Sequence, residues 1–202
     1  KVQLDDELSF IDGEISDFVK IEYYVEDEIF TYQSIKKGEK ITVKVNVHNT
    51  GSTDGKDVVQ IYATVPYTPG GIEKAHKVLV GFAKTEVIRA GQSKTVEIEI
   101  DPYDFASYDY SDANGRNGKG YEIEADTRPY IFTVGKNAHV EYDTFSGYVR
   151  EDIVYNVDPV TGTPVVNRFD DADDQLGSVL SRNNWEGTKP SARTDAEGFV
   201  PS

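Results

Sequence analysis

The stretch Ile41–Phe82 constrains the fold more than any other part of the chain. Its first residues alternate between apolar and polar side chains, the apolar ones being Ile41, Val43, Val45 and Val47. A period of two residues is typical of a β-strand that has one buried face and one face in water. We therefore predict a strand over residues 41–47.

Turn signals divide this stretch into three strands. Asn49-Thr50-Gly51 ends the first, because Asn and Gly tolerate positive φ and Thr can hydrogen-bond to its own backbone. Alternation resumes over Val58–Val65, and a third strand, Val78–Phe82, follows the loop that begins with Pro66–Gly71. Three strands in this order predict a β-meander or a Greek-key segment rather than an active site.

The remaining strand patterns complete the fold prediction. They cover Phe18–Val25, Thr95–Ile100, Tyr121–Glu124 and Tyr130–Val134, while Ile29–Tyr32 and, as an edge strand, Val140–Val149 are additional candidates. About seven strands with turn signals every 8–12 residues or so are typical of a sandwich. Tyr103–Asp109 is expected to form a short helical or irregular turn, and Tyr110–Gly120 a mobile loop. With no helix-period stretch of ten residues to compete, we predict an all-β sandwich.

Composition divides the chain into three parts. Hydrophobic residues make up 38% of the chain, below the usual share of roughly 45–50%, which leaves some residues outside the core. We expect a lead-in segment over residues 1–17, the sandwich over 18–150, and an extended, largely irregular tail over 151–202. Prolines and the acidic run Asp170–Asp174 dominate the tail, which cannot bury enough apolar surface to fold alone. Its few apolar residues are expected to dock on a neighbouring domain: Phe169, Leu176, Val179, Leu180 and Trp185.

Charge and residue usage exclude several classes of partner. The chain has 36 acidic and 21 basic residues, so its net charge of −15 disfavours nucleic acid and anionic membranes as partners. Without cysteine there is no disulfide framework and no thiolate nucleophile or metal site. No apolar run approaches the ~18 residues of a membrane span, and no signal peptide is visible. The compartment stays undecided, with the cytoplasm slightly favoured. The missing methionine suggests a piece of a longer protein.

Ordered motifs along the middle of the chain resemble a known family. They are Asn49-Thr50-Gly51, Gly55–Tyr62 (GKDVVQIY), Leu79–Thr85 (LVGFAKT), Ala90-Gly91, Ala106–Asp109 (ASYD) and Gly135–His139 (GKNAH). In this order they resemble the fibronectin type III-like domain of glycoside hydrolase family 3, whose members are mainly β-glucosidases. The resemblance covers roughly residues 41–139 and implies an immunoglobulin/fibronectin type III-like β-sandwich.

The tail extends the resemblance. Asn167–Ala172 (NRFDDA), Leu180–Arg182 (LSR) and Trp185–Thr188 (WEGT) are similar to the connector of family members with inverted domain order. In those enzymes an α/β sandwich domain comes first, the fibronectin-like domain lies in the middle, and the catalytic (β/α)₈ barrel follows. The resemblance implies that the catalytic barrel and the α/β domain of a parent enzyme are the partners of this chain.

We assign no catalytic, cofactor-binding or metal-binding residue from the sequence. Retaining glycosidases need two carboxyl groups about 5–5.5 Å apart. The resemblance places the nucleophile in a Ser-Asp-Trp-like motif of the barrel, which this chain lacks. Acidic clusters such as Asp5-Asp6 and Glu26-Asp27-Glu28 lie in turns without the apolar surroundings that raise a pKa.

Weaker candidates for metal or sugar binding have simpler explanations. Histidines 48, 76 and 139 are scattered, and the calcium-like loop Asp109–Gly120 lacks a closing Glu at the required offset. The Asp170–Asp174 run is explained by a solvated linker. Exposed tyrosines could stack on sugar rings, although buried aromatics are commoner. The candidates are Tyr62, Tyr67, Tyr103, Tyr108, Tyr110 and Tyr121.

The leading hypothesis is a non-catalytic module that braces the catalytic barrel against the α/β domain of a family 3 glycosidase. The loops Pro66–Lys77 and Tyr103–Gly120 are the expected contacts, because they combine aromatics, Gly and Pro between rigid strands. The alternative is an independent module that binds carbohydrate, through weak contacts, or protein. A glycosidase active in its own right is the third possibility.

Overall fold

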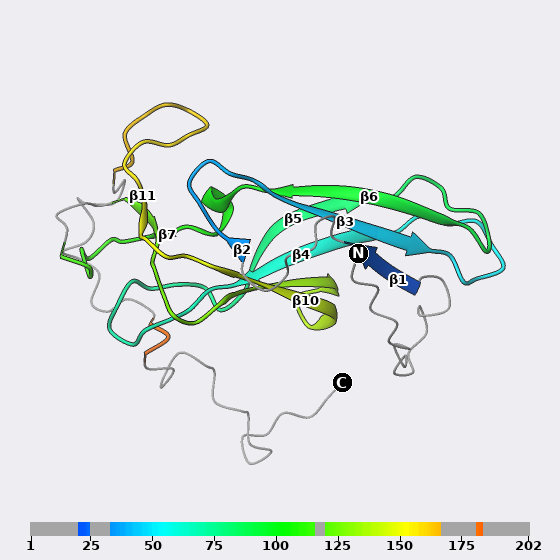
Figure 1. Ribbon diagram of the computed structural model, residues 1–202, viewed down its shortest axis with the longest axis horizontal. Coiled ribbons are helices and arrows are strands. Elements are labelled where there is room, and N and C mark those ends of the chain that lie inside the picture. Colours follow the sequence, from blue (N-terminus) through cyan, green and yellow to red (C-terminus); the bar gives the residue numbers. More distant parts are fainter. Residues whose placement is uncertain (1–19, 25–32, 116–119, 167–180, 184–202) are drawn as a thin grey trace, which may run out of the picture.

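The computed structural model describes residues 20–24, 33–115, 120–166 and 181–183. Two β-sheets pack face to face, with β3 and β6 above and β10 below in the view of Figure 1. The first sheet has the order β1-β3-β6, formed by β1 (Lys20–Tyr24), β3 (Ile41–His48) and β6 (Ser93–Ile100). All its pairs are antiparallel, with Ile41 opposite Ile100 and Tyr23 opposite Val45.

The second sheet has the order β2-β10-β9-β4-β5. Its strands are β2 (Gln33–Ser34), β4 (Val58–Thr64), β5 (Val78–Lys84), β9 (Tyr130–Asn137) and β10 (Val140–Tyr148). Only β2 runs parallel to its neighbour, with Gln33 opposite Gly147. This arrangement confirms the predicted all-β sandwich.

Strand order corrects one prediction and selects between two others. β3 and β4 follow each other in the chain but belong to different sheets, so the β-meander is wrong. β6 returns from the second sheet to lie beside β3, which is the Greek-key alternative. β10, predicted as an edge strand, has β2 on its outer side at Gly147 and Tyr148. Ile29–Tyr32 lies outside the described residues.

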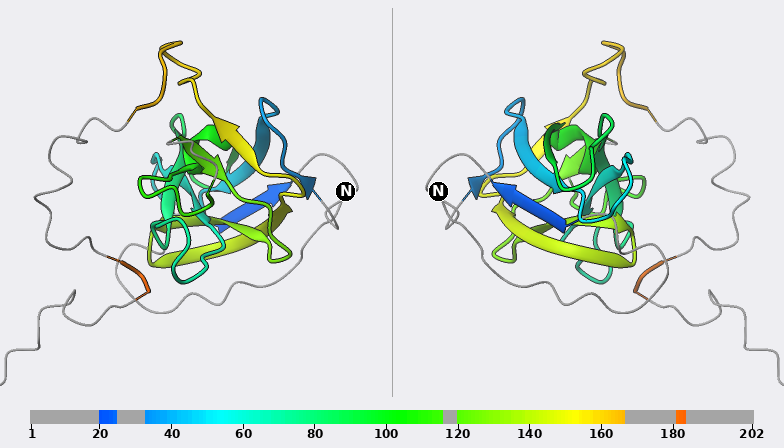
Figure 2. Two further views of the ribbon diagram at one scale, coloured as in Figure 1. Left: turned by 90° about the vertical axis from the view of Figure 1, so that its left-hand side faces the viewer. Right: turned by 90° about the vertical axis from the view of Figure 1, so that its right-hand side faces the viewer.

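A third, small sheet closes one end of the sandwich, as the end-on views in Figure 2 show. Ile100 leads into a short 3₁₀ helix, η2 (Pro102–Phe105), in the stretch where a short turn was predicted. The small sheet has the order β11-β8-β7 and consists of β7 (Ser107–Tyr108), β8 (Tyr121–Ile123) and β11 (Ile153–Tyr155). β11 lies inside the segment that the sequence predicted as tail.

The core lies between the two large sheets and follows the predicted alternation. Val43, Val45 and Val47 of β3 are at most 1% exposed. Phe132 is fully buried at the centre, stacked on Phe145 at 5.0 Å between ring centroids. Apolar burial of this kind supplies most of the free energy of folding.

The turn predicted at Asn49-Thr50-Gly51 does end β3, whose last residue is His48. The Asn49 side chain, 3% exposed, accepts a hydrogen bond from the Gly51 N–H at 2.9 Å. It also donates to the carbonyls of Thr53 and Ile88, both at 2.9 Å. A buried amide with these partners forms an Asx turn and fixes the exit from the strand.

Candidate functional site

The loop Pro66–Lys77 is the more completely described of the two predicted contact loops. It begins where β4 ends, and Ile72, 2% exposed, fixes its middle in the interior. A tight turn precedes Ile72: Gly70 has a φ of +79°, and the Gly71 N–H donates to the Thr68 carbonyl at 3.0 Å. Glycine suits the first of these positions because an L side chain is strained at positive φ.

A buried lysine holds the inner side of the loop. Lys74 is 8% exposed, and its ammonium donates to the Pro66 carbonyl at 2.9 Å. The same ammonium forms an ion pair with Glu124, which follows β8. Buried charges require such partners, so the two ends of the loop are tied to each other and to the sandwich.

An arginine from the turn before β9 supports the same loop. Arg128 donates to the Tyr67 carbonyl at 2.8 Å and to the Thr68 hydroxyl at 2.9 Å. Its guanidinium also pairs with Asp126 at 2.6 Å. The hydrogen bond from Arg128 is the main reason that the pKa of Asp126 lies below its ordinary value. The planar fork of arginine allows these contacts at once.

At its far end the loop is tied to the hairpin between β9 and β10. Lys77 donates to the Ala138 carbonyl at 3.2 Å and forms an ion pair with Glu141. Lys74 and Lys77 of the loop and Arg128 outside it thus tie the loop to three other parts of the sandwich, and we conclude that it is a rigid projection.

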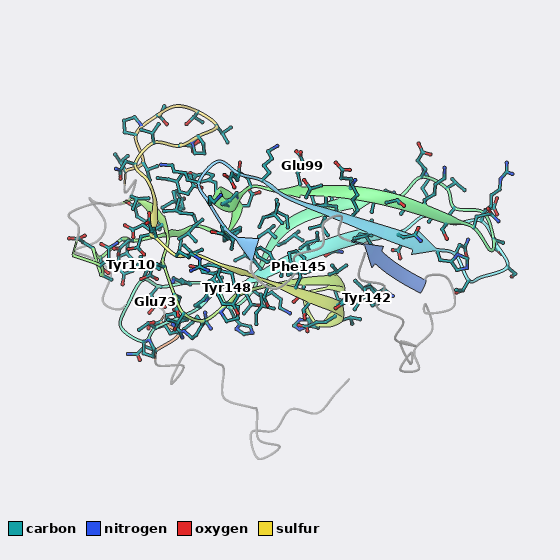
Figure 3. All side chains as sticks on the ribbon, in the orientation of Figure 1. Glu73, Glu99, Tyr110, Tyr142, Phe145 and Tyr148 are labelled. Carbon is teal, nitrogen blue, oxygen red and sulfur yellow. The ribbon has the colours of Figure 1, made fainter. Side chains whose placement is uncertain are left out.

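The outer side of the loop carries Glu73, which contacts the C-terminal segment (Figure 3). Its carboxylate accepts hydrogen bonds from the Tyr67 hydroxyl at 3.1 Å, the Arg182 backbone N–H at 3.1 Å and the Ser181 hydroxyl. Burial acts to raise the pKa of Glu73, but the hydrogen bonds from Ser181, Arg182 and Tyr67 outweigh it, so the pKa lies below its ordinary value.

The second predicted loop, Tyr103–Gly120, is described except for residues 116–119. Its base is organised by Asp109, 1% exposed, whose carboxylate accepts the backbone N–H groups of Ala113 at 2.8 Å and Asn114 at 3.3 Å. The backbone turns at Asp112, which has a φ of +53°. Among the residues that the structure describes, no three His, Cys, Asp or Glu side chains are grouped as a metal site.

The candidate sugar-stacking tyrosines do not form an exposed platform. Tyr103 meets Tyr121 and Tyr155 edge-on, with ring centroids 5.4 and 4.9 Å apart, and Tyr108 meets Tyr121 in the same way at 5.4 Å. These rings cover one another at the end of the sandwich, as edge-to-face pairs do in protein interiors. Tyr62 is 9% exposed, whereas Tyr110 is 37% exposed.

The outer face of the second sheet carries an apolar strip that the sequence analysis did not predict. It consists of Leu79 and Phe82 of β5 and Ile131 of β9, which are 46%, 67% and 37% exposed. A register shift brings the first two together: Ile61 lies opposite Gly81, but Tyr62 lies opposite Leu79, so β5 has one extra residue. Such a β-bulge rotates the strand locally, and Leu79 and Phe82 share a face although they are three residues apart.

Acidic side chains in the described ranges serve structural roles. Asp101 and Asp104 form a capping box around η2, and Glu122, 1% exposed, accepts a hydrogen bond from Asn114. The clusters at residues 5–6, 26–28 and 170–174, and the apolar tail residues from Phe169 to Trp185, lie outside the described residues. In the part of the chain that the structure describes, no helix is long and apolar enough to span a membrane.

Comparison with known sequences shows what the sandwich is similar to. Residues 57–138 match the family model of the fibronectin type III-like domain. A β-glucosidase of Ruminococcus albus is 29% identical over 180 residues, which are 79% of this chain and 18% of that protein. β-Glucosidase A of Butyrivibrio fibrisolvens is 42% identical over 71 residues, which are 35% of this chain and 8% of that protein.

Solved structures agree with the sequence matches. A β-glucosidase from Paenibacillus barengoltzii has a TM-score of 0.57 and 25% identity, over 69% of this chain and 15% of that one. β-Glucosidase 3B from Thermotoga neapolitana, in complex with α-D-glucose, has a TM-score of 0.52 and 28% identity, over 68% and 17%. The chain spans no more than 18% of the length of these relatives. Residues 57–138 thus resemble the fibronectin type III-like domain, and the chain as a whole is similar to parts of β-glucosidases.

Proposed function

We propose that the chain is a non-catalytic structural module of a β-glucosidase-type glycoside hydrolase. In this role it braces the catalytic barrel against the α/β sandwich domain of the parent enzyme. The small share of each relative's length that it covers supports a part within a larger enzyme. In the proposed division, residues 1–17 lead in, 18–150 form the sandwich and 151–202 form the connector toward the barrel, in the inverted domain order. β11 attaches the start of that connector to the sandwich by pairing with β8.

The observation that carries the bracing role is the exposed apolar strip Leu79, Phe82 and Ile131. Large apolar side chains gathered on a rigid sheet are a surface that another domain can cover, and each gains free energy when water is removed from it. The adjacent Pro66–Lys77 loop, held by Lys74, extends this surface as a rigid projection. Interfaces of this kind between domains of one chain fix how the domains are oriented.

The test compares the full enzyme with the isolated 202-residue chain. Phe82→Ser should lower the Tm of the full enzyme, because a contact between domains is lost, but leave the Tm of the isolated chain unchanged, because Phe82 is already 67% exposed there. Val160→Ser, at a position 85% exposed and outside the strip, is the matched control. An unchanged full enzyme would contradict a role for the strip in bracing.

A second experiment tests the non-catalytic part of the proposal. The purified 202-residue chain should release no nitrophenol from an aryl β-glucoside, because the barrel that would supply the nucleophile is a separate domain. Turnover by the isolated chain would overturn the proposal. Retention of the isolated chain on insoluble glucan would instead favour the independent carbohydrate-binding module.

A further inference from the structure

The outer side of the Pro66–Lys77 loop has the features of an arginine-recognition site. The guanidinium of Arg182 lies over the Tyr67 ring, 4.5 Å from its centroid. Its Nη1 donates to the carbonyls of Lys74 at 3.4 Å and Ala75 at 3.3 Å, and Nη2 lies 3.4 Å from His76 Nδ1. An aromatic face combined with in-plane acceptors suits a guanidinium, which is flat and carries donors along its edges.

Glu73 binds the Ser181 side chain and the Arg182 backbone. One carboxylate oxygen accepts the Ser181 hydroxyl and the other accepts the Arg182 N–H at 3.1 Å. The Asn183 N–H donates back to the Ser181 hydroxyl at 3.0 Å, which folds the segment into a turn. Hydrogen bonds to an ionised carboxylate are stronger than neutral ones, so Glu73 can hold this turn in place.

The receiving groups are also held by contacts that do not involve Arg182. The Tyr67 hydroxyl donates to Glu73, the Tyr67 carbonyl is held by Arg128, and Lys74 is held by Glu124. A site that is already ordered loses little entropy on binding, which favours retention of Ser181-Arg182.

We propose that Tyr67, Glu73 and the carbonyls of Lys74 and Ala75 form a clasp that binds Ser181-Arg182 of the same chain and fastens the connector back onto the sandwich. The clasp brings the chain, which leaves the sandwich after β11, back into contact with it. This proposal goes beyond the bracing role because it concerns contacts within this chain alone. In Figures 1 and 2 the residues after β11 project from the upper side of the sandwich, whereas Ser181–Asn183 lie on the lower side. The clasp therefore sets the side of the sandwich from which residue 184 onward continues.

The single tryptophan of the chain reports on the clasp in the 202-residue protein. Trp185 follows Arg182 by three residues, so its fluorescence anisotropy decay should contain a slow component from tumbling with the whole domain. Arg182→Ala and Glu73→Gln should each lose that component. Arg182→Lys should lose it as well, because an ammonium cannot stack on the ring and reach both carbonyls in one plane. The control Arg193→Ala, an arginine further along the same segment, should keep it.

Three outcomes would overturn the proposal. The first is a slow component that survives in both Arg182→Ala and Glu73→Gln while their far-UV circular dichroism and Tm show a folded sandwich. The second is loss of the slow component on dilution of the wild type, which would mean that the arginine comes from a second copy. Equal loss in Arg193→Ala would also count against it, because the effect would then not depend on the clasp.

Discussion

The ion pair between Lys74 and Glu124 should respond unequally to removal of its two partners. The side chain of Lys74 is 4% exposed and that of Glu124 is 30% exposed. What matters in each variant is the charge left behind, because an uncompensated charge in the interior is costly whereas one that reaches water is not. We therefore expect Glu124→Ala to destabilise the domain more than Lys74→Met.

The structure gives the approximate size of each effect. Breaking a buried pair costs about 3–5 kcal/mol when the remaining charge stays buried. In Glu124→Ala the Pro66 carbonyl is the direct partner that the ammonium keeps among the described residues, so we expect a loss near the lower end, about 3 kcal/mol. In Lys74→Met the carboxylate can hydrate and the methionine retains the apolar packing. The lost hydrogen bond to Pro66 then accounts for about 1 kcal/mol.

Urea unfolding of the isolated chain measures these differences, provided that the m-values agree with that of the wild type. The double variant should be hardly less stable than Lys74→Met alone, because no buried charge remains in either. The control is the exposed pair between Lys40 and Glu99, whose side chains are 52% and 54% exposed. Glu99→Ala should lower the unfolding free energy measurably less than Glu124→Ala does. A greater loss for Lys74→Met than for Glu124→Ala would refute the reasoning, and so would costs that simply add.

Three further variants test other parts of the sandwich. A Cβ on Gly135 would lie 2.5 Å from the Val140 carbonyl oxygen, so Gly135→Ala should lower the unfolding free energy by about 1–3 kcal/mol, whereas Gly55→Ala, with open space around it, should not; thermal melts compare the two. Tyr155→Phe should stabilise by about 1 kcal/mol, because the buried hydroxyl has no hydrogen-bond partner in the described part of the chain. Burial raises the pKa of Tyr155 to about 12. With respect to this group the fold is therefore fully stable relative to the unfolded chain below pH 10, and it loses unfolding free energy as the pH rises toward 12. Tyr155→Phe should lose less unfolding free energy over this range, as measured by urea unfolding at each pH. Burial acts to raise the pKa of Glu73, but the hydrogen bonds that it accepts outweigh burial, so the folded-state pKa lies below 4.5. The ionised carboxylate therefore stabilises the fold above pH 4.5, and this stabilisation is lost as the pH falls through the folded-state pKa. Glu73→Gln should weaken this acid dependence, and a variant with the wild-type slope in acid would contradict the assignment.

Period-two patterning predicted the strands that have one face in the core. β3 follows it without exception, because every second residue from Ile41 to Val47 is buried. The bulge in β5 carries no such signal: strict alternation would place Val80 and Phe82 on one face, yet Val80 is 6% and Phe82 is 67% exposed. A bulge exists only relative to the strand that pairs with it, and the sequence does not show which strand that is.

The candidate site could be located from the sequence only as a loop. Pro66–Lys77 was predicted from its mixture of Gly, Pro and aromatics, but a buried Lys74 runs against the usual exposure of lysine. Its partner Glu124 and the contact from Glu73 to Arg182 join residues 50 and 109 positions apart. No local pattern marks such pairs, since each depends on the path of the chain between its members. β11 was not predicted as a strand because its pairing with β8, about 30 residues away in the chain, also leaves no local pattern.

The short parallel pairing of β2 with β10 has a consequence for synthesis. Gln33 and Ser34 gain their strand partners only when Gly147 and Tyr148 have left the ribosome. β8 can pair with β7 earlier, but its pairing with β11 waits for Ile153–Tyr155. Contacts so distant along the chain form slowly, because the chain loses the entropy of closing the long loop before the contact stabilises it. The nascent domain therefore spends the translation of more than a hundred residues with its second sheet unfinished, and it relies on whatever shields apolar strands at the tunnel exit during that interval.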